Sequence, residues 1–448
     1  MTQGNGSNIS TKLQWIAELA KRKPGEALTT LSHHMDMEFM KEAYRRTRKD
    51  GAVGIDGQTA LDYARDLEKN LRSLLERAKS GRYRAPAVRR VRIPKGKGKE
   101  TRPIGIPTFE DKILQRAVSM ILEAIYEQEF ADGSYGFRPG RSAHQALEAL
   151  WKGLMDMRGG WVLEIDIRKF FDTLDKKELL KMLRRRVRDG VILRLIAKWL
   201  NAGVMEKGEL TYPETGTPQG GVISPILANI YLHEVLDMWF KEKVLPRMRG
   251  KAFLIRYADD ATLVFEQEYD ARRVLESLPK RFRRFKLTLH PEKTRLVDFR
   301  RPPKNGPGQS NGGGKSPRSF DLLGFTHYWS LSRRGFWVVK RKTAKDRFSR
   351  GLRNIKEWCR KNRHNFLYLQ HRDLSRKLKG HFAYFGITGN SKALTRFRHE
   401  VVKIWKKWLG RRSQKSTLTW ERYNRLLNRY PLPRPIAIHS IYRRAANP

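Results

Sequence analysis

Two adjacent carboxylates, Asp259 and Asp260, interrupt an otherwise apolar, β-favouring stretch over residues 253–265. Such runs on both sides predict two short strands joined by a tight turn that carries both carboxylates. Like charges at that spacing repel each other unless a cation lies beside them, and Mg²⁺ is the hard divalent ion that oxygen ligands bind. An isolated Asp-Asp pair is more often a solvated turn, so this chemistry requires partners elsewhere in the chain.

A third carboxylate, Asp166, lies in the stretch WVLEIDIRKFFD at residues 161–172. This pattern predicts a strand that ends near Asp166 and then turns. Asp166 at a strand end can join Asp259 in holding two Mg²⁺ ions for in-line phosphoryl transfer. Asp175 precedes Glu178 by three residues, which is the spacing of a capping box, so we assign Asp175 to helix structure.

The composition indicates the partner. The chain has 93 Lys and Arg against 46 Asp and Glu, a formal net charge of +47 in 448 residues. Self-repulsion at that charge destabilises a compact chain, so we expect a polyanionic partner. Nucleic acid is favoured over anionic membrane, because no apolar run approaches the length of a spanning helix and no signal-peptide pattern is found. The single cysteine, Cys359, excludes a disulfide framework and a paired-cysteine zinc site. Together with the lack of a spanning run and of a signal-peptide pattern, this leads us to expect a soluble cytoplasmic protein.

Two basic segments have the composition to hold phosphates. Residues 88–107 predict two strands joined by the tip KGKGK, where Lys95 is a point charge and Arg102 a bidentate fork for a triphosphate. A solvated hairpin explains this stretch equally well when it is taken alone, and the carboxylates elsewhere favour the nucleotide. The loop SYGFRPGRS at residues 134–142 carries Arg138 and Arg141, which we expect to follow a phosphate backbone.

An ordered set of motifs now resembles a known family. The sequence has IPK at 93–95, RPIGIP at 102–107, YGFRPGRS at 135–142, Asp166 with FFD at 170–172, GTPQGG at 216–221 and YADD at 257–260. In this order the motifs resemble bacterial group II intron-encoded reverse transcriptases and maturases, over nearly the whole chain. The resemblance implies an α+β right-hand polymerase, with fingers and an antiparallel palm sheet, followed by an all-helical thumb or maturase domain.

The resemblance also implies roles for individual residues. Asp166, Asp259 and Asp260 would be the catalytic, metal-binding carboxylates for Mg²⁺. Phe171 would lie under the incoming sugar and exclude a 2′-hydroxyl. The other implied residues are Lys95 and Arg102 at the nucleotide phosphates, Gln219 near the nucleotide, and Lys293 as general acid to the pyrophosphate. An exposed lysine at a turn is commonplace, which is the alternative explanation for Lys293.

Composition and resemblance together predict three parts. Residues 1–85 form a basic helical extension, 86–340 form fingers and palm with a flexible loop at 301–318, and 341–448 form the thumb and maturase region. Apolar stripes in the last part predict a helical core, with outward cations contacting RNA. These cations are Arg353, Lys356 and Arg360. No Cys-pair or His-Asn-His pattern follows, so we expect a member without the carboxy-terminal endonuclease domain.

The implied function is that of an RNA-directed DNA polymerase and intron maturase. Such a nucleotidyltransferase binds group II intron RNA, assists its splicing, and copies an RNA template from a DNA primer with dNTPs during intron mobility. Two alternatives stay open: a non-catalytic RNA-binding splicing cofactor, against which the intact carboxylates argue, and a domesticated reverse transcriptase in host defence or repair.

Overall fold

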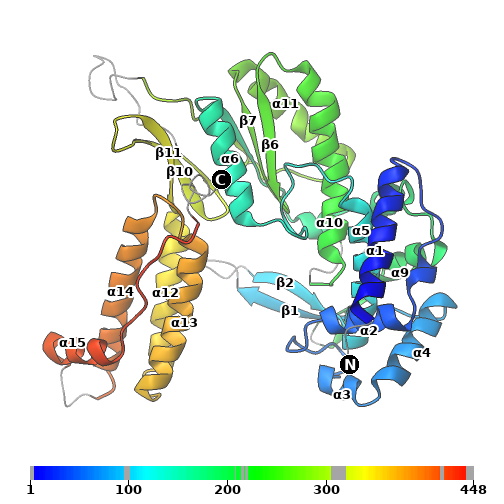
Figure 1. Ribbon diagram of the computed structural model, residues 1–448, viewed down its shortest axis with the longest axis horizontal. Coiled ribbons are helices and arrows are strands. Elements are labelled where there is room, and N and C mark those ends of the chain that lie inside the picture. The colour runs from blue at the N-terminus through cyan, green and yellow to red at the C-terminus, as the bar shows by residue number, and fades with distance from the viewer. Residues whose placement is uncertain are drawn as a thin grey trace. The chain divides into compact units, whose positions relative to one another are not determined.

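The computed structural model divides the chain into two compact units (Figure 1). The first unit comprises Met1–Ala146 and Leu163–Leu296, and the second comprises Leu147–Val162 and Val297–Pro448. The structure describes residues 5–94, 101–206, 208–212, 216, 220–303, 319–413 and 418–439. Lys95, Gln219 and most of the predicted loop at 301–318 lie outside these residues.

Several helices of the first unit pack against α5 (Phe109–Tyr126), which is buried along most of its length. Thr108 caps α5 by accepting the N–H of Asp111. Asp175 accepts the N–H of Glu178 at 2.8 Å, which confirms its predicted role as a helix cap. The α-helices are α1 (Asn5–Arg22), α2 (Met37–Arg46), α3 (Ala60–Ala64), α4 (Leu67–Lys79), α5 (Phe109–Tyr126), α7 (Phe170–Thr173), α8 (Lys176–Arg184), α9 (Gly190–Leu200), α10 (Ser224–Leu232) and α11 (Glu268–Arg284), with short helices η1 (Ser32–His34), η2 (His233–Asp237), η3 (Phe240–Val244) and η4 (Leu245–Arg247).

One sheet of the first unit is built from the predicted strands of residues 88–107. Its strand order is β2-β1-β4-β5, with β1 (Val88–Pro94), β2 (Thr101–Ile106), β4 (Val204–Glu206) and β5 (Glu209–Thr211). Strands β1 and β2 are antiparallel, with Ile93 opposite Arg102. The predicted strand pair is therefore confirmed, and Arg102 is exposed on β2.

The second sheet carries the Asp-Asp pair and has the order β6-β7-β3-β8. Its strands are β3 (Trp161–Ile165), β6 (Ala252–Tyr257), β7 (Asp260–Phe265) and β8 (Arg295–Asp298). Strands β6 and β7 form the predicted antiparallel hairpin, and α11 packs against β7. Only Asp259 lies in the two-residue loop, because Asp260 pairs with Tyr257 as the first residue of β7.

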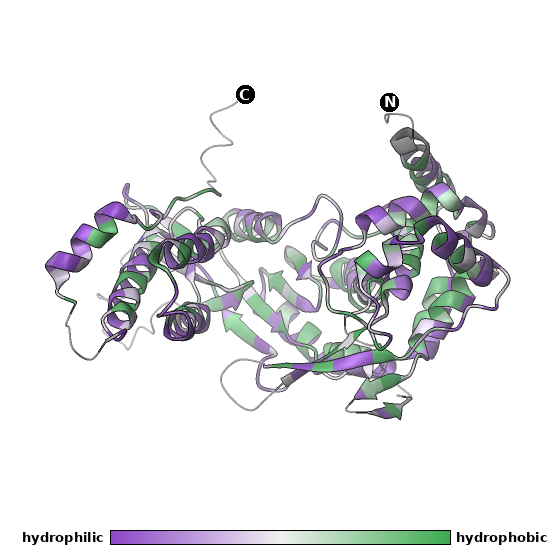
Figure 2. Cartoon of the chain, turned by 90° about the horizontal axis from the view of Figure 1, so that it is seen from below, coloured by the Kyte–Doolittle hydropathy of each residue, from purple (hydrophilic) through white to green (hydrophobic). Residues whose placement is uncertain are grey.

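The second unit joins an antiparallel sheet, in the order β11-β10-β9, to a helical core. Its elements are β9 (Phe320–Leu322), β10 (Phe325–Leu331), β11 (Trp337–Thr343), most of α6 (Ala143–Asp156), α12 (Lys345–Lys361), α13 (Leu367–Phe385), α14 (Ser391–Leu409) and α15 (Trp420–Arg429). Figure 2 shows hydrophilic residues in purple interleaved with hydrophobic residues in green along these helices. The buried residues include Ile355 and Cys359 on α12 and Val401 and Trp405 on α14, so the predicted apolar stripes of these two helices are confirmed as core. Helix α13 adds Leu374 and Leu378, which no predicted stripe included.

The strands of residues 320–343 belong to the second unit. The indole of Trp151 on α6 donates to the Val339 carbonyl at 2.9 Å, and the Tyr384 hydroxyl on α13 donates to the Leu323 carbonyl at 2.8 Å. The compact units therefore divide the chain differently from the boundary near residue 340, and the three functional parts stay a prediction. No helix among the described residues is long and apolar enough to cross a membrane.

A buried carboxylate, Asp189, ties the start of α9 to the segment after α1. Asp189 is 4% exposed and accepts N–H groups from Val191 and Ile192 through one oxygen and from Leu31 and Ser32 through the other. Burial alone would raise the pKa of Asp189, but these backbone N–H donors together lower it below its usual value. One side chain therefore satisfies donors from two distant segments.

We expect Asp189→Ala to lower the free energy of unfolding by about 2 to 3 kcal/mol, because it leaves several buried N–H groups without acceptors. Urea unfolding followed by tryptophan fluorescence measures the loss. Asp66→Ala is the matched control, since Asp66 is the N-cap of α4 but accepts no capping hydrogen bond. Equal losses in the two variants would contradict the assigned role of Asp189.

Candidate active site

The β6–β7 turn places Asp259 through a strained backbone. Ala258, the first residue of the two-residue loop, has a φ of 57°, and it is largely buried. The left-handed region costs a residue with a Cβ about 1 to 2 kcal/mol, and glycine is the usual residue there. Asp259 is half-buried and Asp260 is exposed. The turn therefore presents two carboxylates from a conformation that needs support from neighbouring groups.

The connection after β3 places Asp166 beside Lys293. The Thr288 carbonyl accepts the N–H of Arg168 at 2.8 Å, and the Asp166 carbonyl accepts the N–H of His290 at 2.8 Å. These bonds hold the end of β3 against residues 288–294. The Lys293 ammonium lies 3.3 Å from the Asp166 carboxylate, and both side chains are partly exposed. The structure thus brings together two of the predicted site residues, and Lys293 is the cation that Asp166 holds.

The three carboxylates have the donor chemistry of a Mg²⁺ site. Because β7 lies next to β3 in the sheet, Asp166 and the Asp259–Asp260 pair come from neighbouring strands. Carboxylate oxygens are the ligands that Mg²⁺ prefers. Within the described residues no three His, Cys, Asp or Glu side chains are grouped closely enough to hold a metal ion. The metal-binding role of the three carboxylates therefore stays a prediction.

Two glycines connect the predicted nucleotide-binding segments. Gly216 has a φ of 82°, and a Cβ placed on it would lie 2.7 Å from the carbonyl oxygens of Phe171 and Asp172. Gly220 has a φ of 110° and its backbone lies against Ile104 and Gly105 on β2, the strand that carries Arg102. The close approach of these backbones requires glycine at both positions. Phe171 is half-buried on α7, with its ring 5.2 Å from that of Phe170.

Arg138 does not have the surroundings of a phosphate contact. Its side chain is 7% exposed, and it donates to the Glu127 carboxylate at 2.9 to 3.1 Å and to the carbonyls of Ala131 and Ser134. The guanidinium is therefore occupied inside the protein, where it fixes the loop. Arg141 is half-buried over the Tyr135 ring. RNA binding by Arg141 stays a prediction, and for Arg138 the structure favours a structural role.

A family model described as "Reverse transcriptase (RNA-dependent DNA polymerase)" matches residues 93–327, just over half of the chain. This chain belongs to the reverse transcriptase family. The match includes the hairpin turn, the end of β3, both glycines and Lys293. A right-hand polymerase fold follows from the family, and the helices and largely antiparallel strand pairs of this reverse transcriptase agree with it.

Individual similar proteins indicate which branch of the family this chain resembles. The reverse transcriptase is 37% identical over 285 residues to the "Group II intron-encoded protein LtrA" of Lactococcus lactis subsp. cremoris, covering 60% of this chain and 47% of that protein. It is 37% identical over 258 residues to "Protein YkfC" of Escherichia coli K12, covering 51% of this chain and 68% of that protein. The "Putative COX1/OXI3 intron 1 protein" of Saccharomyces cerevisiae is 32% identical over 224 residues, 49% of this chain and 26% of that protein.

These relatives confirm the predicted resemblance to group II intron-encoded reverse transcriptases. The matched part spans about half the length of LtrA.

A buried polar pair that the motifs did not predict supports the glycine-rich turn. The reverse transcriptase holds Asp111 at 1% exposure, where it accepts hydrogen bonds from Tyr83 and Trp199, both at 2.6 Å, and from Gln115 at 3.1 Å. The other end of Gln115 accepts the N–H of Ile223 at 3.3 Å, just before α10. The signal in the sequence was an Asp and a Gln one helical turn apart on the apolar helix α5.

Burial raises the pKa of Asp111 to about 6, although its three hydrogen-bond donors work to lower it. Between the ordinary value of 3.8 and about 6, the folded reverse transcriptase therefore binds a proton that the unfolded chain releases. The stability that this proton supplies is complete below the unfolded pKa and is lost as the pH rises through the folded value.

We expect Asp111→Asn to remove this pH dependence. The free energy of unfolding of wild type minus that of Asp111→Asn should therefore fall as the pH rises from about 4 to about 6, and then level off. Urea unfolding at a series of pH values measures both proteins. A difference that stayed constant or rose over this range would contradict the raised pKa.

Proposed function

We propose that this reverse transcriptase is an RNA-directed DNA polymerase that also serves as the maturase of a group II intron. The observation that carries the proposal is the two-residue turn with Asp259, on a hairpin next to the strand that ends at Asp166, in a chain that belongs to the reverse transcriptase family. The reverse transcriptase would bind group II intron RNA and extend a DNA primer on an RNA template with dNTPs.

We assign the β6-β7-β3-β8 sheet to the palm, the β2-β1-β4-β5 sheet to the fingers, and α12–α15 to the thumb. Asp166, Asp259 and Asp260 would hold two Mg²⁺ ions. When bound, such ions supply charge that activates the primer 3′-hydroxyl and stabilises the transferring phosphoryl group. The observed chemistry of the donors fits this role, because all three are carboxylates and one already holds a cation, that of Lys293.

Other residues would bind the nucleotide and move a proton. Arg102, exposed on β2, would donate bidentately to the triphosphate together with Lys95. Gln219 would pack near the incoming nucleotide. Lys293 would hold a proton on its Nζ for the leaving pyrophosphate, and its position 3.3 Å from Asp166 supports a place beside the reacting phosphates.

RNA binding would use the outward cations of the thumb helices. Helix α12 buries Ile355 and Cys359 and leaves Lys356 and Arg360 exposed, with Arg353 half-buried. A net charge of +47 favours contacts with many phosphates. Because these cations and the carboxylates are different residues with different chemistry, splicing assistance and polymerisation should be separable.

We expect Asp259→Asn to lower cDNA synthesis by several orders of magnitude while intron binding and splicing stay close to wild type. Asparagine keeps the size of the side chain, removes a metal-binding charge, and relieves repulsion with Asp260. Primer extension and splicing are measured side by side at equal concentrations of folded protein.

The counterpart is Arg353→Ala combined with Lys356→Ala, which should weaken intron binding before it affects extension of a short primer-template. If Asp259→Asn abolished both activities while folded, the turn would have to be part of the RNA-binding site, and the proposed separation would fail.

We expect Phe171→Ala to permit incorporation of ribonucleotides while deoxynucleotide use is largely retained, because the smaller side chain leaves room for a 2′-hydroxyl. Primer extension with both nucleotide types gives the discrimination ratio. Phe170→Leu is the matched control, since the Phe170 ring is buried against Tyr231 and should affect stability without changing this ratio. An unchanged ratio in Phe171→Ala would remove Phe171 from the sugar site.

A further inference from the structure

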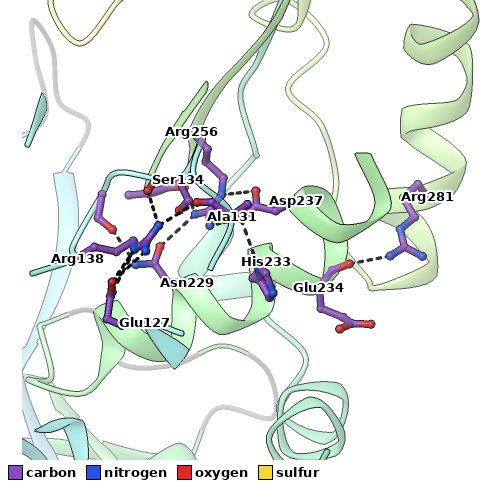
Figure 3. A network of polar contacts seen from close by, with 12 residues as sticks. Glu127, Ala131, Ser134, Arg138, Asn229, His233, Glu234, Asp237, Arg256 and Arg281 are labelled. Atoms are coloured by element: carbon purple, nitrogen blue, oxygen red, sulfur yellow. Dashed lines mark hydrogen bonds and ion pairs between the residues drawn. The ribbon is translucent and has the colours of Figure 1, made fainter. Parts of the chain in front are cut away.

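A fully buried arginine stands on β6 three residues before Asp259. Arg256 is 0% exposed, and its guanidinium donates to both oxygens of Asp237, at 2.7 and 2.6 Å (Figure 3). Its remaining terminal nitrogen donates to the Asn229 side-chain oxygen and to the Ala258 carbonyl, each at 3.0 Å. One buried side chain therefore connects the helical segment of α10 and η2 directly to the strained turn.

A second support reaches the turn from the segment before Arg138. The backbone of Gly136 lies so close to Ala258 that a Cβ on Gly136 would overlap the Ala258 nitrogen. The side-chain amide of Asn229, also buried, donates to the Gly136 carbonyl at 2.7 Å. Asn229 thus holds Arg256 with one end and Gly136 with the other, and Ala258 is held between them.

The segment before Arg138 is itself fixed to β6. The N–H of Arg256 donates to the Gly133 carbonyl, and the N–H of Tyr135 donates to the Arg256 carbonyl, both at 2.8 Å. The ion pair of Arg138 with Glu127, the residue that follows α5, holds the far end of the segment. Figure 3 shows both arginines, Asn229 and Asp237 gathered around this point. Neither support for Ala258 can shift without breaking several buried hydrogen bonds.

Stability alone does not account for two buried charges here. Removing an ion pair from water carries a large desolvation cost, and apolar residues of similar volume are often as stabilising. Burial works to raise the pKa of Asp237, but the charge of Arg256, the hydrogen bonds from Arg256 and the His233 imidazole 3.7 Å away together lower it, so the pair is ionised. What an apolar replacement cannot supply is a donor to the Ala258 carbonyl.

We propose that Arg256, Asp237 and Asn229 form a clamp that positions Asp259 by holding Ala258 in its left-handed conformation. This inference rests on the proposed polymerase function, since Asp259 is there a metal-binding residue. The three are positioning residues, because they act through Ala258 and touch neither the substrate nor the metal. Groups of this kind, behind the residues that bind a metal, typically change metal affinity or activity by about 10- to 100-fold when replaced.

The principal variant is Arg256→Met combined with Asp237→Leu, which removes both buried charges together and so leaves neither unpaired. We expect it to fold and to bind RNA as wild type does. Its kcat for primer extension should fall by about 10- to 100-fold, and the Mg²⁺ concentration for half-maximal activity should rise. Binding of Mn²⁺ as a probe ion, followed by electron paramagnetic resonance, should weaken in parallel, which gives a readout that does not require catalysis.

Rescue distinguishes positioning from a general structural role. Adding Ala258→Gly to the double variant should recover part of the kcat and of the Mn²⁺ affinity, because glycine adopts a positive φ at no steric cost. The matched control is Arg186→Met with Glu129→Leu, which removes a largely buried ion pair located at the end of α1. This control should leave the Mn²⁺ affinity and the Mg²⁺ dependence of the folded protein unchanged.

The outcomes are distinguishable. A folded double variant with wild-type kcat and Mn²⁺ affinity, or one whose losses Ala258→Gly does not reduce, would overturn the clamp. If the wild-type chain made no cDNA while its Mn²⁺ binding responded to the variants as described, the polymerase proposal would fail and the clamp would stand. If the double variant did not fold, Arg256→Lys would decide, because its ammonium keeps the charge but lacks the fork that reaches Asp237, Asn229 and Ala258 together. Losses of kcat and of Mn²⁺ affinity in this variant would support the clamp, and wild-type values would overturn it.

Discussion

The conformation of the β6–β7 turn depends on a buried ion pair, that of Arg256 with Asp237. A charge in the interior is tolerated only when its hydrogen-bonding capacity is satisfied, and the guanidinium meets that condition with two carboxylate oxygens, one amide oxygen and one backbone carbonyl. The last of these acceptors belongs to Ala258. The hydrogen bonds that satisfy the buried arginine are therefore the same ones that fix the turn.

Two buried carboxylates, Asp237 and Asp111, have pKa values that are shifted in opposite directions. Asp237 faces a permanent cation, so its pKa is lowered and it stays ionised. Asp111 forms no ion pair with a cation among the described residues, and the effect of its full burial outweighs that of its three side-chain donors, so its pKa rises to about 6. The first arrangement gives a geometry that is insensitive to pH near neutrality. The second lies on α5 next to the glycine-rich segment, to which Gln115 connects it.

Much of the architecture could be predicted, because its signals are local. Runs of β-favouring residues predicted the β6–β7 hairpin and the β1–β2 pair, and helical patterns of apolar residues predicted the core stripes of α12 and α14. The candidate carboxylates came from their β-favouring flanks, and the order of the motifs then implied their roles. The role of Arg138 could not be predicted, because its partner Glu127 is brought to it by the end of α5 and not by any local pattern.

The same limit applies to Asp111, which depends on Trp199, and to Arg256, which depends on Asp237 and Asn229. Arginine in a basic chain is usually exposed, so only tertiary contacts could assign these side chains to the interior. Residues 320–340 were assigned to fingers and palm, but side-chain contacts with α6 and α13 draw the strands of this segment into the second unit.

The alanine at position 258 affects which backbone conformation the β6–β7 turn adopts. Glycine would take the same positive φ without strain, but it would also populate many other conformations, so the loop carrying Asp259 would be less defined when the metal is absent. Alanine has fewer conformations to choose from and reaches the left-handed one only when Arg256 and Gly136 hold it there. The strain is therefore coupled to the clamp: the turn is well defined when the buried bonds are complete, and it loses its preference for this conformation when they are broken.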